Sequence, residues 1–308
     1  MQKKAKLPYT IFLDHFPSTS QKIYRDFPDV FSEEYRENAV KYAQQLSDIQ
    51  NDSYIIGYFM TNEPLWAFVR HLNLGYECLI SSKAIQSKKV LIDWLKTRFS
   101  TIEQLNQIFE SEFSDFSELE SVNLHTPIGE KAFALLDEFT TVLIREFVRV
   151  PAESLRKVNN KYLNLGLRYA FISSEHLFAG SEFLNVFSIN CYNISAKENI
   201  EHIYEATKLP VMIGEFTFGA LDRGLPATCI QGVSSQRERG RAINHYVEEA
   251  KWTGHCIGVH HFQLNDEPYL GRFDGENYNI GLVDICNREY EEVTESFKPI
   301  HYIPPIFF

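Results

Sequence analysis

The 308-residue sequence lacks the signatures of several common protein classes. Neither a G-x-G-x-x-G turn nor a G-x-x-x-x-G-K-[ST] loop follows its first strand-like run, which removes the main sequence support for a nucleotide-binding fold. No apolar run approaches the roughly 20 residues that cross a bilayer, so we expect no membrane partner. The N-terminus MQKKAKLPYT is basic but has no apolar core behind it, and as it stands it is not a signal peptide.

Closely spaced cysteines and an excess of positive charge are missing too. The five cysteines lie far apart without C-x-x-C spacing, which favours free thiols over a disulfide framework or a zinc site. The 30 Lys and Arg against 41 Asp and Glu give a formal net charge of -11, which argues against nucleic acid as a partner. Since repeats, low-complexity tracts and Gly/Ser/Pro linkers are also absent, we expect residues 1–308 to form a single domain.

What the sequence does contain is an alternation of short apolar runs with longer amphipathic stretches. The runs are rich in β-branched and aromatic residues and are apolar on both faces, which is typical of a parallel sheet covered on both sides. The stretches between them have helical spacing of apolar residues, for example Tyr35, Ala39 and Ala43. The pattern predicts an α/β fold, either a doubly wound open sheet or a (β/α)8 barrel. The predicted strands span residues 54–60, 163–169, 184–190, 211–215 and 257–263.

Two glutamates stand at the ends of two of these runs: Glu63 follows SYIIGYFM, and Glu215 lies in PVMIGEFTF. In a (β/α) barrel the chemistry gathers at the carboxyl ends of the strands. Glycoside hydrolysis needs such a pair of carboxyl groups, because one protonates the leaving oxygen while the other attacks the anomeric carbon or activates water. Other side chains expected at these ends are Arg168, Asn190, Tyr192, His260, His261, Phe262 and Asp266.

Purely structural roles for the same residues remain open. Glu63 precedes a proline and would suit the first turn of a helix, where the dipole favours a carboxylate. Glu215 is also compatible with a structural ion pair. Trp66 is either a core residue or a stacking platform for a sugar. His260 and His261 point to opposite faces of a strand, which argues against a shared metal ion, and we expect neither a metal nor another cofactor.

Around the two glutamates the sequence resembles the retaining glycoside hydrolases of clan A, in particular the β-agarase branch related to bacterial β-galactosidases. IGYFMTNEPLW is similar to the acid/base segment that ends the fourth barrel strand, and IGEFTFGALDRG to the agarase nucleophile segment. DEPYLGRFDGENYNIGLVD resembles the loop after the eighth strand. The resemblance extends from Phe27 to Tyr290 and implies a (β/α)8 barrel of the triosephosphate-isomerase type, with strands four to eight recognisable.

This resemblance also implies roles for the matched residues. Glu63 would be the general acid/base and Glu215 the nucleophile, with their carboxyl groups about 5–5.5 Å apart. Asn62 would bind the 2-hydroxyl of the sugar, and Tyr192 would orient the nucleophile. The implied substrate is a galactose-containing polysaccharide such as agarose, or its oligosaccharides, with a small β-galactoside as the alternative. The expected substrate-binding residues are Asn62, Trp66, Arg168, Asn190, Tyr192, Asp222, His260, His261, Phe262, Asp266 and Asn277.

Two features depart from the family pattern. His261, after His260, stands where relatives usually carry the tryptophan that forms the floor under the sugar. The 52 residues before Ser53 are also too few for three strand–helix units of about 30 or more residues each. We therefore expect a barrel incomplete at its N-terminal side, weak activity of this chain alone, and self-association through open sheet edges.

The apparent truncation keeps a second class of function open, a non-catalytic carbohydrate-binding or vestigial barrel fragment. It also leaves the localisation open. The chain as it stands would be cytoplasmic, and it would be secreted or periplasmic if an N-terminal part carries an export signal.

Overall fold

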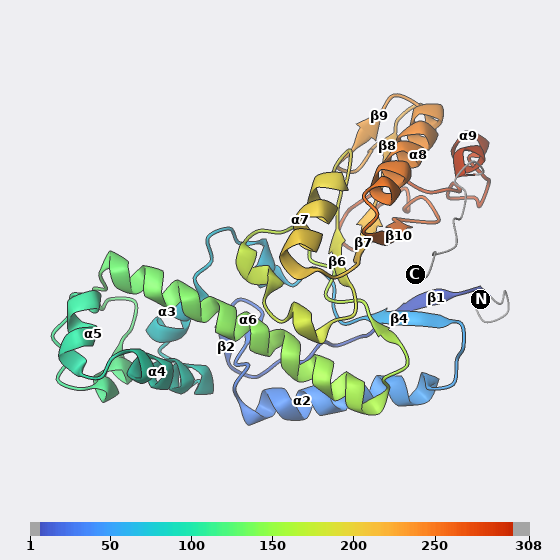
Figure 1. The fold of residues 1–308 in the computed structure, drawn as a ribbon. Coiled ribbons are helices and arrows are strands. Elements are labelled where there is room, and N and C mark those ends of the chain that lie inside the picture. The colour runs from blue at the N-terminus through green and yellow to red at the C-terminus, as the bar shows by residue number, and fades with distance from the viewer. Residues whose placement is uncertain (1–6, 298–308) are drawn as a thin grey trace. The chain divides into compact units, whose positions relative to one another are not determined.

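The computed structural model describes residues 7–297 as a mixed α/β structure (Figure 1). The chain divides into two compact units, with the boundary between Val186 and Phe187. Each unit contains a three-stranded sheet in which all neighbouring strands are parallel. Parallel pairing needs a crossover segment between the strands, and helices supply these crossovers in both units.

The sheet of the first unit has the order β1-β4-β5. Strand β1 pairs with β4 along its whole length. The elements of this unit are β1 (Tyr9–Phe12), β2 (Lys22–Tyr24), β3 (Phe27–Pro28), α2 (Glu33–Ala43), η1 (Gln44–Ile49), β4 (Ile55–Phe59), η2 (Leu65–Phe68), α3 (Leu74–Ile80), α4 (Gln86–Arg98), α5 (Ile102–Phe109), η3 (Phe116–Ser121), α6 (Glu130–Val158), β5 (Leu163–Asn164), η4 (Glu175–Phe178) and η5 (Ser181–Phe183), where η denotes a 3-10 helix.

The long helix α6 organises the core of the first unit, with α2 and α3 packed against it (Figure 1). Its buried residues recur at helical spacing, as in Leu136, Phe139, Leu143 and Phe147. The hydroxyl of Tyr35 in α2 donates a hydrogen bond of 2.7 Å to the carbonyl of Phe147. The predicted apolar face of α2 is confirmed, since Tyr35 and the two alanines that follow it at helical spacing are all buried.

The sheet of the second unit has the order β10-β7-β6. Helix α8 begins after Ser235, whose hydroxyl accepts from the amide of Glu238, and Gly254 follows its end with φ +72°. The elements of this unit are β6 (Phe187–Asn190), α7 (Lys197–Thr207), β7 (Val211–Phe216), β8 (Gly219–Ala220), β9 (Gly232–Val233), α8 (Gln236–Trp252), β10 (Cys256–His261), α9 (Glu291–Thr294) and η6 (Glu295–Phe297).

The expectation of five adjacent parallel strands is wrong in one respect. The strand before Glu63, β4, and the strand that carries Glu215, β7, belong to different sheets, and the described residues form no closed barrel. The run predicted at 163–169 shortens to the two residues of β5. Gly166 and Arg168 have φ of +89° and +50°, and positive φ ends the extended conformation that a longer ladder would need.

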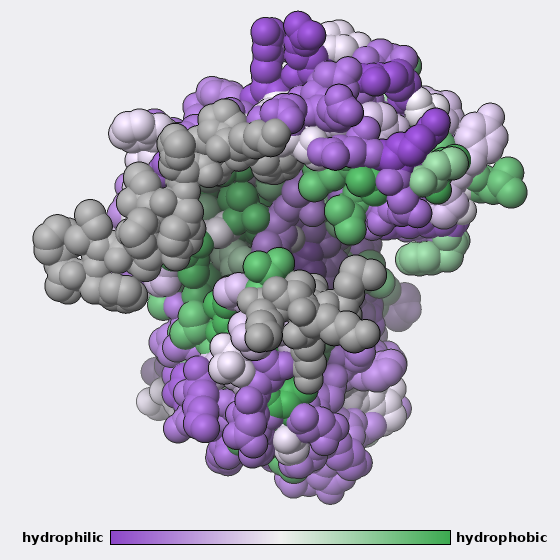
Figure 2. Space-filling view, turned by 90° about the vertical axis from the view of Figure 1, so that its right-hand side faces the viewer, coloured by the Kyte–Doolittle hydropathy of each residue, from purple (hydrophilic) through white to green (hydrophobic). Residues whose placement is uncertain are grey.

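One face of the molecule is largely polar. Figure 2 shows a face on which hydrophilic residues predominate and apolar residues gather in separate patches. Within residues 7–297 no helix has both the length and the apolar character needed to cross a membrane. All five cysteines are free, as their spacing predicted, and burial raises the pKa of the Cys78 thiol.

Candidate active site

Glu63 lies four residues after the end of β4, where the backbone is held by the loop that follows β5. The amide of Met60 donates to the carbonyl of Gly166 at 2.8 Å, and the amide of Glu63 donates to the carbonyl of Arg168 at 3.1 Å. Glu63 and Arg168 both have positive φ, 47° and 50°, which is uncommon for residues other than glycine. Because such backbone strain gathers at functional sites, it supports a role for this carboxylate.

The turn after Glu63 is fixed by a residue that sequence analysis missed. The carboxylate of Asp26 accepts hydrogen bonds from the amides of Leu65 and Trp66, both at 2.8 Å, and so caps the start of η2. The hydroxyl of Ser173 donates to the carbonyl of Ala67 at 2.6 Å and ties this turn to the loop after β5. No local sequence signal identifies Asp26, because it lies about 40 residues before the amides that it caps.

The structure favours a core position for Trp66. Its side chain is 1% exposed and packs edge-to-face against Phe27 and Phe147, with ring centroids 4.9 and 5.3 Å away. This enclosure supports the core alternative for Trp66, and its substrate-binding role stays a prediction. Asn62 and Arg168 are half-buried beside Glu63, and the Arg168 guanidinium lies 5.0 Å from the ring centroid of Phe59.

Glu215, near the end of β7, is held by the two residues that follow the neighbouring strand β6. Its carbonyl accepts from the amide of Cys191 at 2.9 Å, and the Tyr192 hydroxyl donates to its Oε2 at 2.7 Å. Asn190, buried at the end of β6, pairs in register with Glu215. The contact from Tyr192 to the carboxylate is the hydrogen bond that the family resemblance implied, and its orienting role stays a prediction.

Tyr246 of helix α8 contacts the same segment. The ring of Tyr246 stacks on Phe216 with centroids 4.2 Å apart, and its hydroxyl donates to the carbonyl of Cys191 at 2.8 Å. Sequence analysis did not single out Tyr246. The helical spacing of Tyr246 with Arg239, Ile243 and Ala250 could have identified it, because these residues lie along one buried face of α8.

Strand β10 ends in the histidines that replace the expected tryptophan. The amide of Phe262 donates to the carbonyl of Phe216 at 2.9 Å, and His261 lies edge-on to the Phe216 ring at 5.6 Å. Burial, followed by the charge of Arg239, lowers the pKa of His261 to about 4. His261 is therefore neutral at pH 7, which suits a hydrogen-bonding role. His260 is half-buried on the same strand, and the peptide bond between Phe262 and Gln263 is cis.

The loops after β7 and β10 are joined by a buried polar network around Arg239. Its guanidinium donates to the carbonyls of Phe218 and Gly281 at 2.9 and 2.8 Å, and burial lowers its pKa to about 10. The Asp266 carboxylate is 6% exposed and accepts from the Asn279 amide, the Tyr290 hydroxyl and the Gly281 backbone. Asp266 therefore belongs to this network, and the substrate contact expected for it stays a prediction.

Two further predicted residues lie on these loops. The carboxylate of Asp222 is exposed and accepts from the backbone amide and side chain of Gln236 at 3.1 and 3.2 Å, at the start of α8. Asn277 is half-buried in the loop after β10. Their substrate-binding roles stay predictions, as does the separation of the Glu63 and Glu215 carboxyl groups, which belong to different units.

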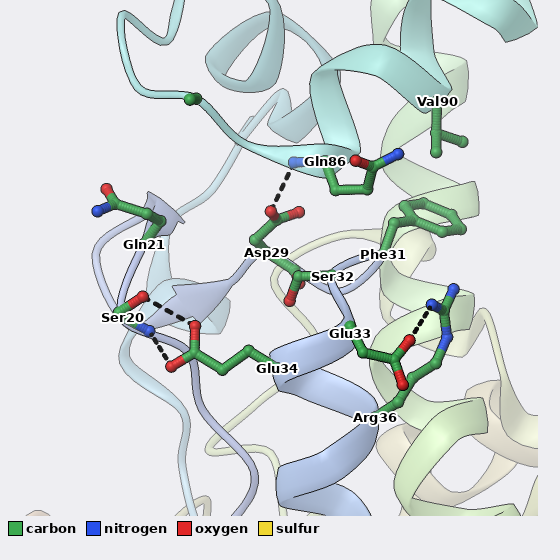
Figure 3. A pocket seen from close by; sticks show the side chains of 11 residues that line it. Ser20, Gln21, Asp29, Phe31, Ser32, Glu33, Glu34, Arg36, Gln86 and Val90 are labelled. Atoms are coloured by element: carbon green, nitrogen blue, oxygen red, sulfur yellow. Dashed lines mark hydrogen bonds and ion pairs between the residues drawn. The ribbon is translucent and has the colours of Figure 1, made fainter.

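The first unit also contains a cavity of about 510 Å³ away from Glu63, at the starts of α2 and α4 (Figure 3). Its carboxylates already have partners. Asp29 accepts from the amide of Gln86 at 2.6 Å, Glu34 from the amide and hydroxyl of Ser20 at 2.8 Å, and Glu33 pairs with Arg36 at 3.2 Å. These groups stabilise a junction between two helices, and nothing in the arrangement favours chemistry.

The second unit has a cavity of about 540 Å³ in the loops that follow β7 and β10. Its walls include Tyr269 and Tyr290 together with Arg223 and Arg288. Arg288 pairs with Asp284 at 2.7 Å, and Arg223 pairs with Glu292. Among residues 7–297 no group of three or more His, Cys, Asp or Glu side chains is arranged to hold a metal ion.

The class of protein follows from comparison with known families. The matching family places the chain among the clan A glycoside hydrolases related to the β-galactosidases. The chain belongs to glycoside hydrolase family 42, described as β-galactosidase, whose sequence profile matches residues 5–297.

Individual relatives point to the agarases. The chain is 27% identical to Beta-agarase B of Vibrio sp. (strain JT0107) over 302 residues, which cover 94% of this chain and 32% of that protein. The crystal structure of the agarase AgWH50C is similar with a TM-score of 0.85 and 27% identity, over 97% of this chain and 44% of the other. The structure of an exo-β-agarase, 23% identical, shares the fold with a TM-score of 0.83 over 95% of this chain and 42% of that one. The chain thus spans about a third of the length of the curated relatives that it matches.

Proposed function

We propose that this chain carries the catalytic residues of a retaining glycoside hydrolase that cleaves β-glycosidic bonds in a galactose-containing polysaccharide or its oligosaccharides. The observation that carries the proposal is the hydrogen bond from the Tyr192 hydroxyl to Oε2 of Glu215, which orients a carboxylate at a strand end for attack on an anomeric carbon. The names of the similar proteins, β-agarase and agarase, support the galactan substrate.

In the proposed reaction Glu63 protonates the glycosidic oxygen while Glu215 attacks the anomeric carbon, so that the leaving sugar departs with a proton and a glycosyl ester forms on Glu215. Glu63 then accepts a proton from water, whose oxygen attacks the anomeric carbon and releases Glu215. Two displacements at one carbon retain the β configuration. Asn62 is assigned the 2-hydroxyl of the sugar bound at the nucleophile.

We further infer that residues 1–308 derive from a (β/α)8-barrel domain that is incomplete at its N-terminal side in this chain. The similarity to the agarase structure over 97% of this chain, but only 44% of the other, supports this inference. The proposal is that residues 1–308 are part of one catalytic domain. Hydrolysis should then be weak in the 308-residue chain and stronger in any product extended by upstream coding sequence in the same frame.

The mechanism is tested by hydrolysis of agaro-oligosaccharides with the product anomers followed by proton NMR. We expect the β anomer to appear first and mutarotate later. Glu215→Gln should abolish turnover, and Tyr192→Phe should lower kcat by about 10- to 100-fold because the nucleophile loses its orienting donor. Glu205→Gln, an exposed glutamate on α7, is the matched control and should leave the rate unchanged. First appearance of the α anomer, or substantial turnover by Glu215→Gln, would contradict the mechanism.

Activity on small β-galactosides is a second candidate, because the matching family is described as β-galactosidase. Assays with a chromogenic aryl β-galactoside and with agaro-oligosaccharides distinguish the small-galactosidase candidate from the galactan hydrolase. Efficient cleavage of the aryl galactoside without cleavage of agaro-oligosaccharides would favour the small substrate. Binding of galactan without any hydrolysis, by the chain and by the extended product alike, would favour a non-catalytic carbohydrate-binding protein.

A further inference from the structure

An aromatic pair, of which one ring is exposed and the other half-buried, lies on the two loops that frame Glu63. Phe68 ends η2, five residues after Glu63, and Phe171 follows Arg168 by three residues. Their rings meet edge-to-face with centroids 5.8 Å apart at 83°, and the Arg70 guanidinium carbon lies 5.8 Å from the Phe171 centroid. Phe68 is 39% exposed, although aromatic side chains of this size gain most by burial.

The loops that carry this pair are held rigidly. The Asp26 carboxylate fixes the first amides of η2, and the Ser173 hydroxyl joins the loop of Phe171 to the carbonyl of Ala67. An exposed apolar group on a fixed backbone, bordered by a cation, is characteristic of a ligand-binding surface. Because the loops are already ordered, less conformational entropy is lost when a ligand binds.

We propose that Phe68, Arg70 and Phe171 form a platform that binds a pyranose ring of the galactan chain outside the subsites at the cleaved bond. The apolar C–H face of a pyranose removes aromatic surface from water when it packs on a ring, and the five N–H donors of Arg70 match its hydroxyl oxygens. Five residues from Glu63 to Phe68 span at most roughly 17 Å, which places the platform within a few sugar rings of the carboxylate. This inference rests on the proposed function, and it assigns particular residues, Phe68, Arg70 and Phe171, to a sugar-binding platform beside Glu63.

The test is calorimetric titration of the full 308-residue chain carrying Glu215→Gln, so that no ligand is cleaved. The ligands are neutral agaro-oligosaccharides of two, four and six sugars. We expect the parent to bind the hexasaccharide more tightly than the disaccharide. Phe68→Ala, Arg70→Ala and Phe171→Ala should each weaken hexasaccharide binding about 5- to 10-fold and leave disaccharide binding unchanged.

Two controls separate binding from folding. Phe171→Tyr keeps the aromatic ring and should retain the parent affinity for the hexasaccharide. Trp252→Ala removes an 82% exposed aromatic side chain at the end of α8 and should change neither affinity. Arg70 is exposed, so its variant should fold normally even if Phe171→Ala does not.

The outcomes distinguish this inference from the proposed function. Length-dependent binding by the parent with unchanged hexasaccharide affinity in Phe68→Ala and Arg70→Ala would overturn the platform and leave the proposed function standing. An equal loss of disaccharide and hexasaccharide affinity would also overturn it, because the residues would then act at the cleaved bond or on folding. A parent that binds none of the three oligosaccharides would overturn both.

Discussion

At the scale of single residues, the strain around the candidate acid/base is the most informative feature. Glu63 and Arg168 adopt positive φ where glycine would be relaxed, and the amide of one bonds the carbonyl of the other. Each such conformation costs on the order of 1 kcal/mol or more and persists because the surrounding hydrogen bonds determine it. Substitution at these positions should therefore affect the position of the carboxylate as well as its charge.

His261 leads to a prediction about pH. Its pKa is about 4 in the folded chain against an ordinary value near 6.5, because the site is buried and near Arg239. Between these pH values the unfolded chain binds a proton that the folded chain does not, so the stability present above pH 6.5 is lost as pH falls toward 4. The total loss of unfolding free energy from this group is about 3–3.5 kcal/mol.

The measurement is the free energy of unfolding in urea at pH 7, 6 and 5 for the parent and for His261→Gln. The parent should lose about 2 kcal/mol more than the variant between pH 7 and pH 5, since glutamine does not titrate. Parallel losses in both proteins would show that the imidazole is accessible to protons in the folded state.

At the scale of elements, close backbone contact within the first sheet should limit substitution. A Cβ added at Gly57 in β4 would lie 2.3 Å from the carbonyl oxygen of Leu163 in β5, whereas one added at Gly258 in β10 would meet only the flexible side chain of Met212 at 3.3 Å. Backbone cannot move aside as a side-chain terminus can. Gly57→Ala should therefore destabilise the protein by about 2–3 kcal/mol, and Gly258→Ala by less than about 1 kcal/mol.

Thermal and urea unfolding of the two glycine variants check this prediction. Gly57→Ala should also reduce activity, because β4 and the loop after β5 together position Glu63. Equal stability of the two variants would mean that β4 and β5 separate at little cost.

At the scale of the whole molecule, the unpaired edge strands of an open sheet favour association between copies of the chain. In the second unit β10 is an edge strand of its sheet, and Ile257 on it is 55% exposed. Unpaired edges with apolar side chains promote pairing between chains, and a lysine on the edge opposes it. We expect concentration-dependent self-association of the 308-residue chain that Ile257→Lys reduces.

Light scattering coupled to size-exclusion chromatography measures this association over a range of concentrations. Ile194→Lys is the matched control, since Ile194 is 67% exposed but lies in the loop before α7. It adds the same charge without altering a strand edge. An equal effect of both substitutions would indicate a general charge effect, and a monomer at all concentrations would contradict the prediction.

The sequence by itself determined the features that depend on local pattern. Apolar runs located β4, β6, β7 and β10, helical spacing located α2, and the motifs around Glu63 and Glu215 identified the family. These succeed because alternation and periodicity report the local backbone and the burial of each face.

Only the tertiary structure decided which distant residues meet. It placed Trp66 in a core with Phe147, gave Asp26 the role of capping the turn after Glu63, and separated β4 and β7 into different sheets. It also placed Asp266 in a buried network with Tyr290 and Asn279. The physical reason is that such contacts join groups tens of residues apart, and their free energy comes from burial and hydrogen bonding that no local pattern encodes.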